Sequence, residues 1–192
     1  SALETSLEVV ATAQDVEDFD VEYESNSGDV KVVWSNSAGT ATVTGVRDAN
    51  CTGGTSTCTW SGVGTPATFA NDATHLDLSA NPDPATDGMA FASIGNGGGD
   101  LQIGYWSGSA WINNNDVDTT AQVPIAQTKY VATGWLKSGS TTRAIITFYD
   151  NGATNIGSYS MATNGSFALI SDFTTTPALG TQGYYDIQTD PF

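Results

Sequence analysis

A short motif that recurs at nearly constant spacing constrains this chain more than any other feature. Each clear copy is an Asp between two apolar residues, at Phe19-Asp20-Val21, Leu76-Asp77-Leu78 and Tyr185-Asp186-Ile187. The first two copies lie 57 residues apart and the last two lie 109 apart, and a looser version, Tyr130-Val131-Ala132, stands near the midpoint of the longer gap. Three prolines close the units at similar intervals: Pro66, Pro124 and Pro177. A period of about 55 residues built from short strands is typical of stacked or radial β units.

Each repeat unit has the pattern of four short strands joined by tight turns. Residues 101–106, for example, alternate apolar side chains with polar or small ones, as a strand with one buried face does. Ser-Gly and Asn-Gly pairs between the strands supply the positive φ angles of tight hairpins. The predicted strands are 19–24, 30–34, 41–46 and 57–60 in the first unit, 76–80, 89–94, 101–106 and 110–112 in the second, and 130–136, 144–149, 155–159 and 166–170 in the third.

We therefore predict an all-β fold of about three tandem four-stranded antiparallel meanders, similar to the blades of a β-propeller. The units span residues 18–69, 70–126 and 127–179. Residues 1–17 contain a strand in the register of a last strand, and residues 180–192 contain one in the register of a first strand. The two termini would then form a split fourth unit, within one chain or between two. A β-sandwich, in which the repeat reflects hairpin spacing only, is the alternative.

The charge balance argues against one class of partner. The chain has 192 residues, of which 21 are acidic and 5 basic, and its net charge is −16. This charge repels phosphate backbones and anionic lipid headgroups, so we do not expect nucleic acid as a partner. No apolar run approaches the roughly 20 residues that span a bilayer, so we expect no membrane insertion. No charged-then-apolar signal opens the sequence, so we expect a processed or excised part of a longer protein.

Two cysteines indicate the compartment. Cys51 and Cys58 are separated by six small or turn-forming residues, which allow the chain to fold back so that the two sulfurs meet. We predict a disulfide that closes a hairpin loop. The alternative, a metal or redox site with two thiols, requires closer spacing and further ligands. A disulfide requires an oxidising compartment, so we expect an extracellular or cell-surface protein.

A resemblance to a known group of proteins rests on four segments: DFDVEYES at 18–25, SGDVKVVW at 27–34, NPDPATDGM at 81–89 and YWSGSAW at 105–111. They are similar to long, repetitive secreted proteins of bacteria and archaea. Units of those proteins alternate a Tyr-Glu, Ser-Gly-Asp and valine-rich half with an Asn/Asp-Pro and tryptophan-hairpin half. The resemblance covers about residues 2–190 and implies a propeller-like surface protein, without catalytic residues. The cystine loop and the third unit, which lacks the tryptophan hairpin, depart from the pattern.

Asparagine and aspartate gather in two predicted loops, residues 81–87 and 113–118. Their oxygen atoms are the ligands that Ca²⁺ prefers, although neither loop has the spacing of an EF-hand and solvated acidic loops are the simpler alternative. We expect no other cofactor. The candidate calcium ligands are Asp83, Asp87, Asn115, Asp116 and Asp118.

Other side chains are candidates for contact with glycans. Exposed tryptophans could stack on sugar rings, and the candidates are Trp106, Trp111 and Trp135. Asn50 and Asn164 each begin an acceptor pattern for N-glycosylation. His75 is the only histidine, and we expect it at the surface or at a strand edge, without a nucleophile partner.

Three functions compete. We expect first an extracellular structural or adhesive repeat protein without enzymatic activity, able to assemble into filaments by sharing strands between chains. The alternative is a glycan-binding module, and the discriminating observation is whether the tryptophan rings are buried between sheets or lie exposed in a row. The third is a glycoside hydrolase with an acid pair, although no spacing among the acids singles out such a pair. The expected partners are therefore other copies of the chain and surface glycans.

Overall fold

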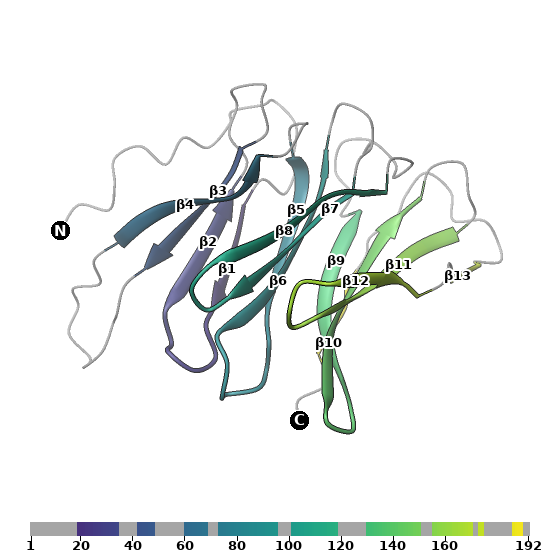
Figure 1. Cartoon of the computed structure of the whole chain (residues 1–192). Helices are drawn as coiled ribbons and strands as arrows, with labels where there is room; N and C mark the ends of the chain where they lie inside the picture. The colour runs from purple at the N-terminus through teal and green to yellow at the C-terminus, as the bar shows by residue number, and fades with distance from the viewer. Residues whose placement is uncertain are drawn as a thin grey trace.

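The computed structural model describes residues 19–34, 42–48, 60–68, 73–95, 101–118, 130–150, 155–170, 173–174 and 186–189 (Figure 1). These residues form strands and turns. No helix of the length and apolar character needed to cross a bilayer occurs in this part of the chain. The predicted all-β class is confirmed.

The strands form three antiparallel sheets, and within each sheet the chain adds its first four strands in sequence order. We call these sheets blades 1, 2 and 3. Blade 1 consists of β1 (Phe19–Tyr23), β2 (Val30–Trp34), β3 (Thr42–Asp48) and β4 (Trp60–Thr68). Blade 2 consists of β5 (Ala73–Ala80), β6 (Gly88–Gly95), β7 (Leu101–Ser107) and β8 (Trp111–Asp118). Blade 3 consists of β9 (Val131–Ser138), β10 (Thr141–Tyr149), β11 (Asn155–Ala162), β12 (Phe167–Leu169) and β13 (Phe173–Thr174), which also pairs with β11.

The last strand of each blade occupies the position that the repeat predicts. β4, β8 and β12 begin at Trp60, Trp111 and Phe167, respectively, so these three aromatic residues hold equivalent backbone positions. The last strands of blades 1 and 2 are nevertheless longer in the structure than predicted. The fourth strand of blade 1 starts at Trp60, where the prediction ended it, and β8 continues to Asp118. Residues 113–118, predicted as a calcium-binding loop, are therefore part of a strand.

The hairpin turns follow the turn chemistry of the sequence. Gly28 connects β1 to β2 with φ of 75°, and Gly139 connects β9 to β10 with φ of 62°. Residues other than glycine rarely adopt such backbone angles, which explains why a glycine follows the serine in each of these turns. Between β5 and β6, the Asn81 side chain accepts a hydrogen bond from the Asp83 amide at 3.0 Å and so closes the proline-rich turn.

The blades stand side by side through their first strands. β1 packs beside β5, and β5 packs beside β9, while Figure 1 shows the sheets following one another from the purple blade 1 to the green blade 3. Blade 2 buries apolar side chains on both faces, because alternate residues of a strand point to opposite faces. Met89 and Phe91 belong to the apolar cluster shared with blade 1, whereas Ala90 and Ala92 belong to the cluster shared with blade 3.

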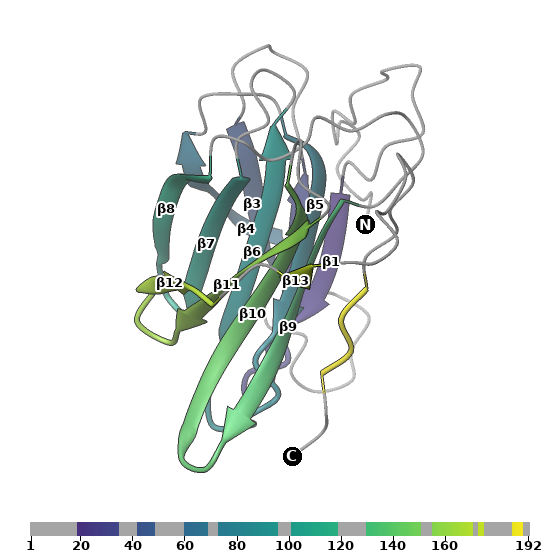
Figure 2. The ribbon, with the colours of Figure 1, turned by 90° about the vertical axis from the view of Figure 1, so that its right-hand side faces the viewer.

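The C-terminal segment lies against the first strand of blade 3 (Figure 2). The amide of Trp135 donates a hydrogen bond to the Thr189 hydroxyl at 3.1 Å. A Cβ at Gly134 would overlap the side chain of Ile187, so β9 and the C-terminal segment approach closely there. Residues 186–189 thus occupy the place of a next first strand but have no strand assignment. The split fourth unit stays a prediction, because residues 1–17 lie outside the described part of the chain.

Candidate functional site

A cavity of about 370 Å³ opens where the first strands of the three blades meet the C-terminal segment. We call it the axial cavity. Each blade contributes to it, and the lining is mostly polar. Its walls are formed by Glu22 of β1, Asp77, Leu78, Ser79 and Ala80 of β5, Thr133 of β9, and Asp186, Ile187 and Thr189 of the C-terminal segment.

The repeated aspartates fix the first strands to one another beside this cavity. Asp20 of β1 accepts a hydrogen bond at 2.7 Å from the amide of Leu78 in β5. Asp77 of β5 accepts two bonds, both at 2.7 Å, from the amide and the hydroxyl of Thr133 in β9. A carboxylate on one first strand therefore binds the backbone of the next. In the third unit the bridge places Ala132 in the position of the aspartate, one residue later than the centre of the looser motif Tyr130-Val131-Ala132, so this unit has no carboxylate there.

The Glu22 carboxylate lines the cavity and has a raised pKa. Burial raises its pKa above the ordinary value of 4.5, and the neighbouring charges of Asp20 and Asp77 raise it further. A hydrogen bond from the Tyr23 amide, at 3.0 Å, acts in the opposite direction. Because the ionised form of Glu22 is poorly solvated, a ligand that donates a hydrogen bond to it would relieve a cost that the free protein carries.

The chemistry of the cavity favours ligands with hydroxyl groups. Carboxylates are acceptors only when ionised, and hydroxyls both donate and accept. Leu78 and Ile187 add apolar surface beside these groups. In the described residues, no group of three or more His, Cys, Asp or Glu side chains is arranged to hold a metal ion. Anionic ligands are disfavoured, because Glu22, Asp77 and Asp186 all carry negative charge when ionised.

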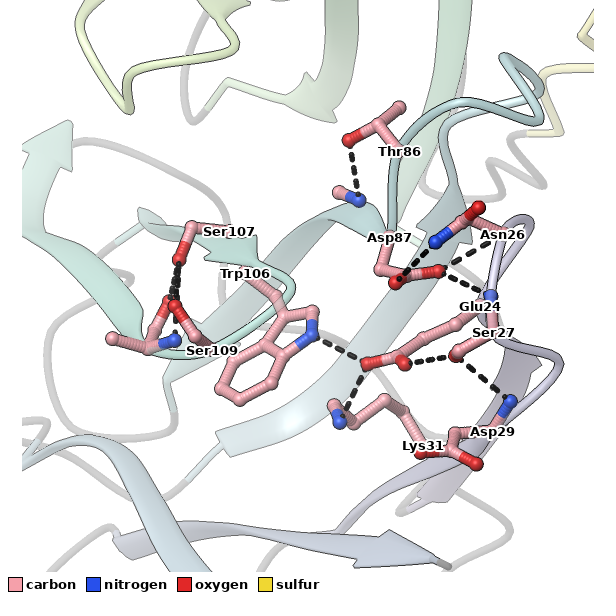
Figure 3. Close-up of polar contacts among 12 residues, drawn as sticks. Glu24, Asn26, Ser27, Asp29, Lys31, Thr86, Asp87, Trp106, Ser107 and Ser109 are labelled. Carbon is pink, nitrogen blue, oxygen red and sulfur yellow. Dashed lines mark hydrogen bonds and ion pairs between the residues drawn. The ribbon is translucent and has the colours of Figure 1, made fainter. Parts of the chain in front are cut away.

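A second polar cluster joins blades 1 and 2 (Figure 3). Glu24 forms an ion pair with Lys31, with Oε1 and Nζ 2.8 Å apart, and both side chains are almost completely buried. The indole N–H of Trp106, from β7, donates to the same carboxylate oxygen at 2.6 Å. The Lys31 ammonium also lies 3.9 Å from the centroid of the Trp106 ring. The contacts of this buried cluster come from residues of blades 1 and 2, so we interpret it as a structural junction between these blades.

The same junction continues along the turns at the edge of the blades. The amides of Asn26 and Ser27 donate to Asp87 at 2.9 and 2.8 Å, respectively. Burial alone would raise the pKa of Asp87, but the hydrogen bonds from these two residues hold it below its usual value. The Ser25 hydroxyl donates to the backbone carbonyl of Asn81. The turn of blade 1 is thereby bound to the proline-rich turn of blade 2.

The tryptophans predicted as stacking platforms are instead packing residues. Trp106 is 6% exposed and Trp135 is 3% exposed, so neither presents a ring face to a sugar. Trp135 donates its indole N–H to the carbonyl of Ser79 at 3.0 Å, across the junction of blades 2 and 3. Trp111 is half-buried and packs on Trp106 and Phe91. Trp106 and Trp135 are buried and each bonds to a residue of a neighbouring blade, so the prediction that they stack on sugars is wrong.

The described candidate calcium ligands, Asp83, Asp87 and Asp118, belong to no group of three or more acids, cysteines or histidines that could hold a metal ion. Asp83 accepts a bond from the Ala85 amide at 2.9 Å, and Asp87 is engaged with blade 1 as described above. Asp118 ends β8 opposite Leu101. Asn115 and Asp116 lie within β8, and the structure does not describe their side chains. Calcium binding stays a prediction.

The other predicted residues are the glycosylation acceptors, the two cysteines and the histidine. Asn164 lies in the exposed turn before β12, where its side-chain oxygen accepts bonds from the amide and hydroxyl of Ser166, and its glycosylation stays a prediction. Cys51, Cys58 and Asn50 lie outside the described residues. His75 is 1% exposed and packs edge-on against the Tyr130 ring, so the surface alternative is wrong, while β5, which contains His75, is an edge strand of its sheet.

Sequence reasoning identified the repeated aspartates but not what they do. It treated Asp20, Asp77 and Asp186 as markers of the period, whereas the structure shows the first two bridging neighbouring blades. It also missed Glu22 and Thr133 as cavity residues. The signal was present in the alternation of acids along residues 18–24, since alternate residues of a strand share one face.

Comparison with solved structures gives the fold. The chain is similar to the crystal structure of Aleuria aurantia lectin, a fungal lectin with a six-bladed β-propeller fold and a novel mode of fucose recognition, at a TM-score of 0.50 and 12% identity. The match covers 86% of this chain and 53% of the lectin. The fold is propeller-like. A mutant of that lectin in complex with Fucα1-6GlcNAc matches at a TM-score of 0.48 and 13% identity, over 86% and 52% of the two chains.

The chain thus spans about half the length of the lectins it resembles. Identity this low shows the fold alone. Neither a protein-family model nor a curated protein matches the sequence.

Proposed function

We propose that this chain is an extracellular, adhesive propeller module without enzymatic activity, which binds glycans in its axial cavity. The observation that carries the proposal is the polar cavity at the junction of the first strands, lined by Glu22, Asp77 and Asp186. Its volume of about 370 Å³ lies within the range of small-ligand sites, and it is walled by three blades and a terminal segment. The likeness to a propeller lectin supports this reading at the level of fold.

Neutral or amino sugars fit this lining better than acidic ones. Sugar hydroxyls can donate charge-assisted hydrogen bonds to Glu22 and Asp186, which are stronger than bonds between neutral groups. The apolar face of a pyranose ring can rest on Leu78 or Ile187. A sialic or uronic acid would instead place its carboxylate beside three acidic side chains. The expected ligand is therefore an uncharged or amine-bearing saccharide.

Binding without hydrolysis is the part of the proposal that concerns how the acids are used, and it is supported by the engagement of one of the three cavity carboxylates. A glycosidase needs two carboxylates free to act on one glycosidic bond, one as acid and one as nucleophile or base. The carboxylate of Asp77 is already engaged by the amide and hydroxyl of Thr133. We therefore assign Asp77 to the architecture of the cavity and Glu22 to ligand contact.

The test is binding of the whole chain to an array of neutral, amino and acidic saccharides, followed by titration calorimetry of the strongest ligand. We expect Glu22→Gln to weaken binding by about tenfold or more, because an amide is a weaker acceptor than a carboxylate. Asp83→Asn is the matched control, since Asp83 lies in the turn before β6 and does not line the cavity. Equal affinity of the two variants, or preference for acidic saccharides, would refute the proposed site.

A second candidate function is structural assembly, in which blades of neighbouring molecules pack against one another. The observation that favours it is a row of exposed apolar side chains on β1, formed by Phe19, Val21 and Tyr23. The two functions are compatible, because a surface protein can both assemble and bind glycans.

A further inference from the structure

Neighbouring blades in this molecule are joined by one repeated arrangement. The first strand of the later blade turns apolar side chains toward the earlier blade, as Leu76 and Leu78 of β5 do toward blade 1. The earlier first strand supplies an aspartate that binds a backbone amide of the later one. The amide concerned belongs to Leu78 in blade 2 and to Thr133 in blade 3. An interface of this kind therefore has an apolar half and an aspartate half.

Blade 1 presents the apolar half of such an interface to solvent. Phe19, Val21 and Tyr23 occupy the positions of Leu76, Leu78 and Ala80, on the face of β1 that points away from blade 2. They are 57%, 43% and 62% exposed, whereas Leu76 and Leu78 are at most 4% exposed. We call these three residues the open face.

The amide at the centre of the open face is also unlike its counterparts. The Val21 amide is equivalent to those of Leu78 and Thr133, which bind an aspartate of the preceding blade. In blade 1 it donates instead to Oδ1 of its own neighbour, Asp20, at 2.7 Å and in an exposed position. An incoming aspartate would replace this local, exposed bond.

The C-terminal segment presents the aspartate half at the other end of the molecule. Ile187 and Thr189 face β9, through the contact with Gly134 and the hydrogen bond from Trp135. Asp186 and Gln188 alternate with them and are exposed. Asp186 is the aspartate of the third clear copy of the motif, so it holds the position of Asp20 and Asp77.

We propose that the open face of one molecule docks onto the C-terminal segment of a second copy, with Asp186 of that copy bonding to the Val21 amide. The occupant is a second copy, because the complementary half lies at the other end of the row of blades, across the axial cavity from β1, and the chain matches only 53% of a six-bladed propeller. Within one molecule neither half covers the other, since Phe19, Val21, Tyr23 and Asp186 are all exposed. The contact joins two different surfaces, so it produces a closed ring or an open filament. This inference rests on the second candidate function.

The first test is the mass of the full chain in solution, measured by sedimentation equilibrium from dilute to concentrated protein. We expect concentration-dependent association that weakens at least tenfold in Val21→Arg, which places a charge in the apolar contact, and several-fold in Asp186→Ala. Leu169→Arg is the matched control, because Leu169 is also an exposed apolar residue, at 56% against 43% for Val21, but lies on β12 at the outer edge of blade 3. It should associate like the unmodified chain.

A cross-linking experiment then separates contact between copies from closure of one chain. Chains carrying Val21→Cys are mixed with chains carrying Asp186→Cys and oxidised mildly, with the unmodified chain as the control for its own cysteines. A covalent heterodimer supports the proposal. A fast-migrating monomer formed by the double variant, without heterodimer in the mixture, overturns it in favour of closure within one chain.

The outcomes distinguish the docking surface from assembly itself. If the chain associates but Val21→Arg and Asp186→Ala associate as strongly as Leu169→Arg, assembly stands and this surface is wrong. If the chain is monomeric at every concentration, both the surface and the structural function are wrong. Neither of these results refutes glycan binding by the axial cavity, which is tested separately with Glu22→Gln.

Discussion

The two junctions between blades use the same aspartate bridge but are stabilised by different means. Between blades 1 and 2, a small apolar cluster around Phe91 and Trp106 is accompanied by the buried Glu24–Lys31 pair and the bonds to Asp87. Between blades 2 and 3, a larger apolar cluster includes Ile103, Ile146 and Phe148, all fully buried. The first junction therefore depends on charge pairing, and the second on the burial of apolar surface.

The difference shows how a repeat can keep one geometry while its chemistry varies. The aspartate bridge fixes the register of neighbouring first strands at both junctions. Away from that bridge, the side chains need only fill the space between sheets and satisfy their polar groups. A junction that contains ions must pair every one of them, because an unpaired buried charge is very costly. The junction between blades 1 and 2 should consequently be the less tolerant of single substitutions.

The largest effect is expected where a buried charge loses its partner. Glu24→Ala leaves the Lys31 ammonium without its carboxylate, and we expect a loss of about 3–5 kcal/mol in the free energy of unfolding, measured by urea denaturation. The double variant Glu24→Gln with Lys31→Met removes both charges and keeps an acceptor for the Trp106 indole. It should recover most of that loss. A loss below about 1 kcal/mol in Glu24→Ala would show that charge pairing does not distinguish this junction.

The apolar junction should respond to lost volume instead. Ile146→Ala opens a cavity in the cluster between blades 2 and 3, and we expect a loss of about 3 kcal/mol in the free energy of unfolding. Because no charge is involved, this loss should be the same at low and high salt. A loss that changes strongly with ionic strength would contradict the contrast between the two junctions.

The aspartate bridges should differ in strength although they share a geometry. Asp77 is 7% exposed and accepts two bonds from blade 3, whereas Asp20 is half-buried and accepts one from blade 2. We expect Asp77→Ala to cost about 2–3 kcal/mol of unfolding free energy and Asp20→Ala about 1 kcal/mol. Chemical denaturation of both variants side by side measures the difference. Equal costs would mean that burial does not set the strength of the bridge.

The smallest effect concerns Glu22 and depends on pH. Its pKa is raised in the folded protein, so the folded state binds a proton more tightly than the unfolded state does. Stability should therefore fall as the pH rises from the ordinary value of 4.5 through the raised pKa of the folded state, and then level off. Glu22→Gln removes this dependence, so its melting temperature should exceed that of the unmodified chain at pH 7. At pH 4 the difference should disappear. A larger difference at pH 4 than at pH 7 would reverse the sign and refute the assignment.

The sequence repeat predicted the blades because the residues that recur are those that the fold requires at fixed positions of each blade. Asp20 and Asp77 recur because each binds the next first strand, and Gly28 and Gly139 mark turns with positive φ. Trp111 and Phe167 recur at the start of the last strand of a blade. Such local constraints can be read from one sequence, and they were sufficient for the order of the first four strands in each blade, although they did not predict β13 in blade 3.

The candidate site could not be predicted in the same way, because it is formed between units. Whether Trp106 is exposed depends on Glu24, which lies in a different blade and accepts its indole N–H. The cavity likewise combines Glu22, Thr133 and Asp186, which are far apart in the chain. Alternation within a strand shows which residues share a face but not which blade that face meets. The polar sequence of residues 113–118 suggested a loop for a similar reason, since the partner strand that holds it in β8 is not visible locally.

The most direct test of the proposed glycan site is hydrogen exchange of the full chain, followed by mass spectrometry, with and without the saccharide that binds most tightly on the array. Ligand in the axial cavity should slow exchange in residues 20–24, 76–80 and 186–189, which come from three separate parts of the sequence. It should leave the outer strands β4, β8 and β12 unchanged. Slower exchange confined to those outer strands, or no change in the residues of the cavity, would contradict the account.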